Sequence, residues 1–253
     1  MLQEVLQLNI FAFLLVFARV GTAFFLLPGF SGVQVPMRMR LALALAVCFL
    51  ITPALVEQMP PLPDAPLMIL ALIGGEVLAG AILGTIPLIL VSAVHVAGTV
   101  ISFVAALANA LAYDPVVQQQ SAIVSGFLAT TATLLIFVTD MHHLFIRALV
   151  DSYDLFRPGI PLDIGDATHL LARHVADSFR VGVQMSAPFL LTGFAYYVGL
   201  GILTRLAPQV PIFFVAMPLQ LIVSIVVLML SVSGIMLATL SYTAEGMRPF
   251  LRP

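Results

Sequence analysis

Long apolar stretches separated by short polar gaps run along the whole chain. Seven stretches have the approximate limits 10–27, 41–56, 67–90, 92–112, 121–139, 181–206 and 212–240. Each is near or below the roughly 20 residues that a membrane-spanning helix needs. Prolines concentrate in the gaps, where helices are expected to end. The pattern predicts an all-α integral membrane protein in which several segments are half-spans or tilted hairpins.

The region 67–112 is almost continuously apolar and is too long for one ordinary spanning helix. Pro87 lies near its middle. Because proline removes a backbone donor and interrupts a helix, we expect a hairpin turn between Pro87 and Ser92.

Composition supports the membrane assignment and excludes several classes of protein. Of the 253 residues, 61% are hydrophobic and only 9% are charged, whereas a soluble domain carries roughly 25% charged residues. The net charge is −2 and no basic run is present, which argues against a nucleic-acid partner. Cys48 is the only cysteine, so an intrachain disulfide is excluded.

Arginine placement predicts the orientation in the membrane. Arg38 and Arg40, four arginines in the polar stretch 140–180, and Arg248 with Arg252 occupy alternate gaps. Positive residues are biased toward the cytoplasm. We therefore expect the N-terminus outside, the C-terminus in the cytoplasm and an odd number of crossings.

The stretch 140–180 is the only extended polar part of the chain. It mixes aspartates with arginines, and Pro158, Gly159 and Pro161 divide it into two helical pieces. We interpret it as a polar cytoplasmic linker inside a single membrane-embedded helical domain that covers 1–253. A docking surface for a soluble partner is the alternative.

Asp114 and Pro115 form an acidic, helix-breaking turn between apolar segments. The turn follows a run of small residues at 98–112 and precedes glutamines at 118–120. Backbone that leaves the helix at membrane depth is tolerated only inside protein or beside water. The turn is therefore predicted to belong to a cavity or a pore.

Small residues also recur at helical spacing, as in closely packed membrane helices. Gly98 and Ser102 begin one stripe, which continues toward Asp114, and a role in lining or sealing a pore is favoured for it. Glu76, Gly80 and Gly84 form a second stripe. For the second stripe, packing within one chain and contact with another subunit both remain open.

Ionisable residues inside apolar segments are costly unless they are paired or hydrated. Glu76 is the only deep acid, and pairing with Arg19 or with a partner chain is the favoured explanation. The alternative function for the chain is a proton-coupled secondary solute transporter, in which Glu76 and His95 would titrate during transport.

No enzymatic constellation is present in the sequence. HExxH, G-x-S-x-G and Gly-rich phosphate motifs are missing, so we expect no catalysis and no cofactor. Asp140, His142 and His143 are clustered, but adjacent helical histidines are expected to point apart. Interfacial polar residues therefore explain the cluster better than a metal site does.

Several blocks of residues together resemble the FliR/SctT family, the R-type subunits of the type III secretion export gate. The matches follow one another in order and cover nearly the whole chain. They comprise Arg19, Pro28 and Val35-Pro36-Met37-Arg38-Met39-Arg40-Leu41-Ala42-Leu43-Ala44; Glu76 among Gly74, Gly75, Gly80 and Gly84; Gly98, Ile101, Ser102, Asp114-Pro115 and Gln120-Ser121; Asp140 with His142; and Ala187-Pro188, Arg205, Pro208, Val215, Met217-Pro218-Leu219 and Gln220.

The resemblance implies helical hairpins assembled with P-type and Q-type subunits into a spiral channel for unfolded substrates. It places the chain in the bacterial inner membrane, within the basal body and among membrane lipids. A switch subunit and a large cytoplasmic export subunit are implied as further partners. The overall pattern favours the flagellar branch over the injectisome branch.

The resemblance also implies site residues. A loop at about 107–121 would plug the closed pore, with Leu111 and Tyr113 as candidates for the apolar seal; any methionine gasket would come from partner subunits. The plug residues are Leu107, Asn109, Leu111, Tyr113, Asp114, Pro115, Gln118, Gln119 and Gln120. The structural and assembly residues are Arg19, Pro36, Arg38, Arg40, Glu76, Gly80, Gly84, Gly98, Ser102, Arg205, Met217 and Pro218.

Overall fold

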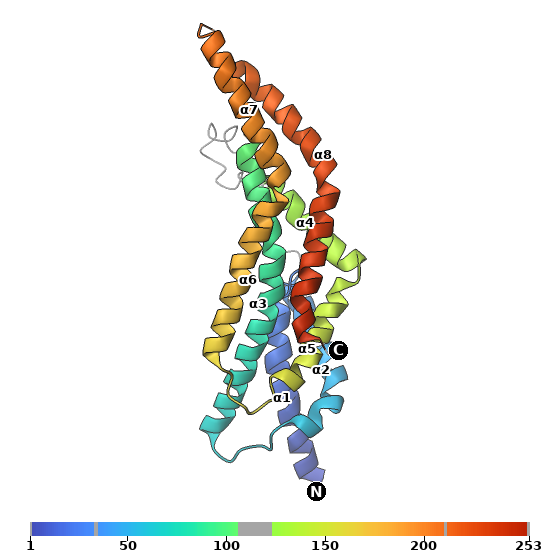
Figure 1. Cartoon of the computed structure of the whole chain (residues 1–253). Helices are drawn as coiled ribbons and strands as arrows, with labels where there is room; N and C mark the ends of the chain where they lie inside the picture. Colours follow the sequence, from blue (N-terminus) through green and yellow to red (C-terminus); the bar gives the residue numbers. More distant parts are fainter. Residues whose placement is uncertain (1, 33–34, 106–122, 210–211, 252–253) are drawn as a thin grey trace. The chain divides into compact units, whose positions relative to one another are not determined.

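The computed structural model describes residues 2–32, 35–105, 123–209 and 212–251, and the regular structure in these ranges is entirely helical (Figure 1). Side chains are described from residue 10 onward and, in the last range, from residue 216. In chain order the elements are α1 (Leu2–Leu26), α2 (Met37–Leu55), η1 (Val56–Gln58), α3 (Pro66–Val104), α4 (Ile123–Val138), α5 (Met141–Leu155), α6 (Ile164–Met185), α7 (Ala187–Leu206), α8 (Ile212–Met247) and η3 (Arg248–Phe250).

Several of these helices are long and apolar enough to cross a bilayer. Within the described residues, four segments meet this condition: Met37–Gln58, Pro66–Val104, Ala187–Leu206 and Ala216–Phe250. A fifth would be α4 with α5, which are bent by 72° at a short break. The apolar part of α1, Ile10–Leu26, is shorter. The expectation of an all-α integral membrane protein is confirmed.

The predicted hairpin between Pro87 and Ser92 is wrong. Helix α3 continues for 39 residues through Pro87. Membrane helices tolerate an internal proline where the surroundings compensate for the lost backbone bond, and Ile86 and Leu90 on either side of it are fully buried. Packing therefore keeps the chain helical at a residue that would end a helix in water.

The apolar stretch 181–206 is divided where the sequence analysis treated it as one. Helix α6 ends at Met185 and α7 begins at Ala187, with Pro188 in its first turn. The proline ring clashes with the preceding helical turn, which explains the break at Ser186.

The chain forms two compact units. The first unit contains Met1–Leu90, Ile136–Val175 and Thr243–Pro253, and the second contains Val91–Leu135 and Ala176–Tyr242. Helices α3, α4, α6 and α8 each contribute residues to both units. The expected division into one domain with a cytoplasmic linker at 140–180 stays a prediction, although this stretch does form two helical pieces, α5 and α6.

In the first unit, α1 lies between α2 and the first part of α3 (Figure 1). Leu15 and Val16 of α1 and Phe145 of α5 are buried. Helix α5 is amphipathic, and its buried face is the one that carries Phe145, Leu149 and Tyr153.

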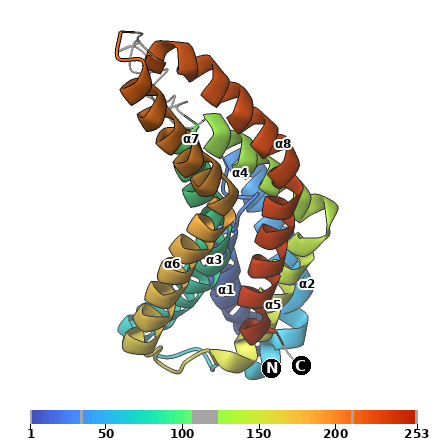
Figure 2. The same cartoon turned by 45° about the horizontal axis from the view of Figure 1, so that its top comes forward.

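In the second unit, α7 and α8 follow one another as a helical hairpin (Figure 2). The core brings together apolar side chains from five helices: Val94, Ala97 and Ile101 of α3, Val124, Leu128 and Ala132 of α4, Met185 of α6, Phe189 of α7, and Ile235 and Met236 of α8.

Candidate functional site

The predicted plug lies outside the described residues. Leu107, Asn109, Leu111, Tyr113, Asp114, Pro115 and Gln118 to Gln120 all fall within 106–122. The plug assignment therefore stays a prediction, and the site is built from the helices that lead into this segment.

Helix α3 ends in a partly buried polar contact directly before the predicted plug. The amide Nε2 of Gln220 donates to the Val104 carbonyl at 2.7 Å and to the Tyr197 hydroxyl at 3.1 Å. The last carbonyls of a helix have no intrahelical partner, so Gln220, which is only 6% exposed, satisfies one of them. We call Val104, Tyr197 and Gln220 the α3 anchor.

Close helix packing surrounds the α3 anchor. A methyl group added at Gly193 of α7 would overlap the Val104 side chain. The neighbouring Tyr196 donates its hydroxyl hydrogen to the Ala216 carbonyl of α8. The end of α3 is thereby held by α7 and α8 together.

The first small-residue stripe makes contacts within the chain. A methyl group at Gly98 would collide with the backbone of Ser125 in α4, and the Ser102 hydroxyl donates to the Gly98 carbonyl at 2.8 Å. His95 Nδ1 lies 3.2 Å from the Ser125 hydroxyl oxygen. Gly98 therefore allows α4 to approach α3, whereas the Ser102 hydroxyl bonds within α3.

A second buried polar cluster lies in the first unit. Arg19 Nε donates to Glu76 Oε2 at 2.7 Å and its Nη2 donates to Oε1 at 3.1 Å, a bidentate geometry that strengthens the pair. Arg19 is 1% exposed and Glu76 4%. Of the two pairings expected for Glu76, the structure shows the one with Arg19.

The same guanidinium also reaches α5. Its Nη1 donates to the Ser152 hydroxyl at 3.2 Å, and Nη2 donates to the Phe156 carbonyl at 2.7 Å. Its central carbon lies 3.9 Å from the centroid of the Tyr153 ring, within cation–π range. Arg19 thus joins α1, α3 and α5 through one buried charge, and we call these residues the Arg19 cluster.

Gly80 and Gly84 make the Arg19 cluster sterically possible. A methyl group at Gly80 would collide with the Arg19 carbonyl, and one at Gly84 would meet the Ala23 carbonyl and Leu26. Both glycines bring α3 against α1 of the same chain, as small residues do between membrane helices.

The sequence of this chain matches a family model described as "Bacterial export proteins, family 1" over residues 10–246. The chain belongs to this family. It is 35% identical to flagellar biosynthetic protein FliR of Caulobacter vibrioides over 225 residues, 87% of this chain and 88% of the relative. It is 32% identical to FliR of Bacillus subtilis over 251 residues, 95% and 94% of the two chains. For FliR of Escherichia coli the identity is 30% over 224 residues, 87% and 82%.

In this bacterial export protein, the other predicted assembly residues have different surroundings. Arg40 Nη2 donates to the carbonyls of Gly32 and Val35 at 2.9 and 3.0 Å, so Arg40 holds the connection between α1 and α2. Pro36 occupies the N-cap of α2 and is exposed, as is Arg38.

Three predicted assembly residues lie on α7 and α8. Arg205 is exposed in the last turn of α7, where a positive charge is favourable to the helix dipole. Met217 is half-buried and Pro218 exposed, both less than one turn before Gln220. Their part in assembly stays a prediction.

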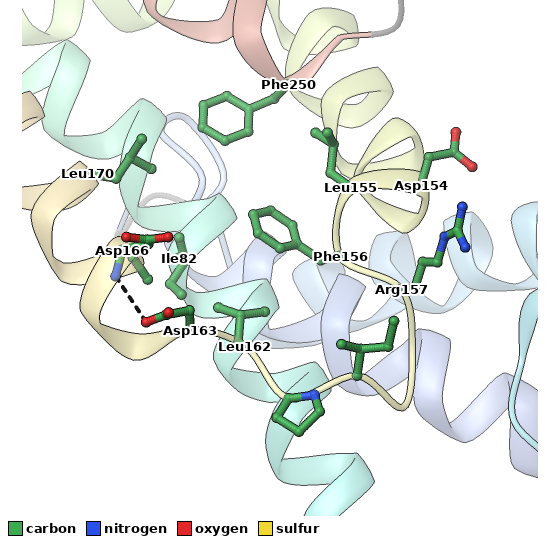
Figure 3. A pocket seen from close by; sticks show the side chains of 13 residues that line it. Ile82, Asp154, Leu155, Phe156, Arg157, Leu162, Asp163, Asp166, Leu170 and Phe250 are labelled. Carbon is green, nitrogen blue, oxygen red and sulfur yellow. Dashed lines mark hydrogen bonds between the residues drawn. The ribbon is translucent and has the colours of Figure 1, made fainter.

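The first unit of the export protein also contains a pocket of about 590 Å³. Figure 3 shows the rings of Phe156 and Phe250 turned toward the same space. Asp163 lines one side, and its carboxylate accepts the backbone N–H groups of Gly165 and Asp166 at 2.8 and 3.2 Å. Capping of α6 therefore explains why the Asp163 carboxylate lies at this position. The rest of the pocket lining is mainly apolar.

Asp140, His142 and His143 lie closer together than expected. The rings of the two histidines are 4.1 Å apart between centroids, so the expectation that adjacent histidines point apart is wrong. Both residues belong to the first turn of α5, where no preceding turn of the helix restricts their side-chain rotamers.

Sequence reasoning gave no site role to Gln220, Tyr197, Ser152 or Tyr153 of this export protein. The signal for Gln220 is available, because a lone amide in an apolar helix requires a hydrogen-bond partner. Its partner could not be named, since Val104 is 116 positions away in the chain.

Proposed function

We propose that this chain is a channel-forming subunit of the flagellar protein export gate in the bacterial inner membrane. Family membership and relatives named as flagellar biosynthetic protein FliR support this system. In the proposal, the chain closes a spiral assembly of P-type and Q-type subunits, and unfolded substrates pass through that channel. The switch subunit and the large cytoplasmic export subunit are its further partners.

The α3 anchor is the observation that carries the proposal. Gln220 fixes the end of α3 at Val104, and the predicted plug begins three positions later at Leu107. Beyond the segment, Val124 and Leu128 of α4 are set in the core of the second unit. A loop that seals a pore requires fixed ends, because otherwise its position in the pore is not determined, and both flanking helices supply them.

The proposed plug closes the pore with apolar side chains on a turn that proline keeps out of helix. Leu111 and Tyr113 form the seal, and Asp114 with Pro115 sets the turn. The glutamines at 118–120 complete the proposed plug. Methionines of partner subunits would complete the constriction.

Exposed apolar surface on α7 and α8 supports an assembly within the membrane. Large exposed apolar patches mark contacts with protein or lipid. On α7 these side chains include Leu191, Phe194, Ile202 and Leu206, and on α8 they include Leu219, Ile222, Met229 and Leu230.

The Arg19 cluster argues against the proton-coupled transporter that the sequence left open. A carboxylate that exchanges protons during transport needs access to water and freedom from a permanent counter-ion. Glu76 is buried and held by two hydrogen bonds from Arg19. We infer that the Arg19 cluster is structural. We also propose that the chain's role is non-enzymatic. The placement of its arginines further supports an N-terminus outside and a C-terminus in the cytoplasm.

Assembly tests the proposal directly. The chain should be expressed alone and together with the P-type and Q-type subunits, extracted gently and measured by native mass spectrometry. We expect a defined complex that contains one copy of this chain, and a smaller but measurable yield of the chain alone. A stable monomer or homo-oligomer that ignores the two partners would contradict the proposal and favour a transporter.

A further inference from the structure

The corner between α4 and α5 has an unusual backbone. Asp140 ends the turn with φ of 58°, and it is the one non-glycine residue with positive φ among those described. The two helices are bent by 72° at this point. Aspartate tolerates this left-handed conformation better than most residues, so the backbone alone is compatible with Asp140 and requires no ligand.

The Asp140 side chain, however, does not do what an aspartate at this position usually does. Asp140 is the N-cap residue of α5, where aspartate normally accepts a backbone N–H of the first turn. Its carboxylate makes no such capping bond within the described structure. Instead Oδ1 lies 3.6 Å from Nδ1 of His143. The carboxylate is directed at the imidazole rather than at the helix.

His142 completes a set of three donors. One ligand atom from each of Asp140, His142 and His143 lies within 4.8 Å of the others. Zinc bonds of about 2.0–2.1 Å in tetrahedral geometry separate ligand atoms by about 3.3 Å. The 3.6 Å separation of Asp140 and His143 is already close to that value, and the separations that involve His142, at most 4.8 Å, require side-chain rotation to reach it.

The imidazole of His142 has an unsatisfied nitrogen and is fixed by aromatic packing. Its Nδ1 is buried and has no hydrogen-bond partner among the described residues, which is costly for a polar atom. Its ring lies 5.1 Å from that of Phe137 in α4, and Phe137 in turn packs on Phe30 at 5.5 Å. The imidazole is therefore held in place against the preceding helix.

We propose that Asp140, His142 and His143 bind one divalent transition-metal ion of the Zn²⁺ class. Two imidazoles and one carboxylate suit Zn²⁺ and its neighbours in the first transition row, whereas Ca²⁺ and Mg²⁺ prefer oxygen ligands. Three protein ligands leave a fourth position for water or for a donor from a neighbouring subunit. The bound ion fixes the corner between α4 and α5.

Cobalt absorption provides a test that does not depend on export. The full chain, purified in detergent without a polyhistidine tag and stripped with a chelator, is titrated with Co²⁺ and then with competing Zn²⁺. We expect ligand-field bands that saturate at one ion per chain and disappear on addition of Zn²⁺. Loss of one histidine by His143→Ala should weaken binding at least about tenfold.

Two further variants keep the test decisive. Asp140→Asn preserves a residue that accepts the left-handed turn while removing the charged ligand, and it should also weaken binding. His169→Ala removes an exposed histidine of α6 and should leave binding unchanged. Circular dichroism of each variant checks its helix content. Absence of Co²⁺ bands in the unaltered chain, or equal weakening by His169→Ala and His143→Ala, would overturn the proposal.

Discussion

The Arg19 cluster and the α3 anchor are two polar contacts of α3 that differ in character, the first buried and charged, the second partly buried and neutral. In the first unit a full charge is satisfied by Glu76, Ser152 and the Phe156 carbonyl. In the second unit a neutral amide satisfies the Val104 carbonyl, with the Tyr197 hydroxyl beside it. Breaking a buried ion pair leaves an uncompensated charge and costs far more than breaking a neutral hydrogen bond. A charged contact therefore suits a fixed scaffold, whereas a neutral contact can be broken at a lower cost in free energy.

The largest expected effect comes from breaking the Arg19 cluster. Arg19→Ala leaves Glu76 buried without its counter-ion and should lower the free energy of unfolding by about 3–5 kcal/mol. Thermal unfolding in detergent, followed by circular dichroism and by the fraction that stays monodisperse, measures the loss. Arg205→Ala, which removes an exposed arginine, is the matched control. If Arg19→Ala and Arg205→Ala had equal melting temperatures, the Arg19 cluster would not contribute to stability.

The next effect tests the packing that brings α3 to α1. Gly80→Ala places a methyl group against the Arg19 carbonyl and should destabilise the chain by about 1–3 kcal/mol. Gly74→Ala is the control, because a methyl group there meets no atom within 4 Å and alanine favours the helix. The two variants should therefore move the melting temperature in opposite directions. If both raise it, α1 and α3 do not approach as closely as described.

Breaking the α3 anchor should lower the stability of the chain less than breaking the Arg19 cluster does, and its main effect should be on closure of the gate. Gln220→Ala leaves the partly buried Val104 carbonyl without its donor, at a cost of about 1–2 kcal/mol. In the assembled gate we expect a raised leak of small ions, measured as conductance in planar bilayers. Gln184→Ala, at an exposed glutamine of α6, is the control. A Gln220→Ala gate that leaks no more than the wild-type gate would show that the α3 anchor does not contribute to closure.

Tyr197→Phe should have the smallest effect. It removes only the hydroxyl that accepts the Gln220 amide, while the Gln220–Val104 bond remains. Gln220 loses only one of its two acceptors, so we expect a loss of about 0.5–1 kcal/mol. Thermal unfolding measured beside Gln220→Ala gives the comparison. If Tyr197→Phe lost more stability than Gln220→Ala, the Tyr197 hydroxyl rather than the Gln220–Val104 bond would be the main contact of the α3 anchor.

The helical class and the need of Glu76 for a partner followed from the sequence, although whether that partner was Arg19 or another chain stayed open. Apolar runs specify membrane helices, and a lone deep acid requires a nearby cation. The course of α3 through Pro87 did not follow, since proline ends a helix in water but is tolerated in a packed apolar setting. The α3 anchor could not be predicted because it joins residues from three helices distant in the chain. The proximity of His142 and His143 depends on a corner whose geometry no residue pattern specifies.

Closure by the segment 107–121 is the central claim, and conductance of the complete gate tests it most directly. The gate assembled with the chain lacking 107–116 should be compared with the unaltered gate in planar bilayers at equal protein density. If this segment closes the pore, we expect the gate with the deletion to leak ions strongly and persistently. Native mass spectrometry should show the same subunit composition for both gates. A deleted gate that assembles normally and conducts no more than the unaltered one would contradict it.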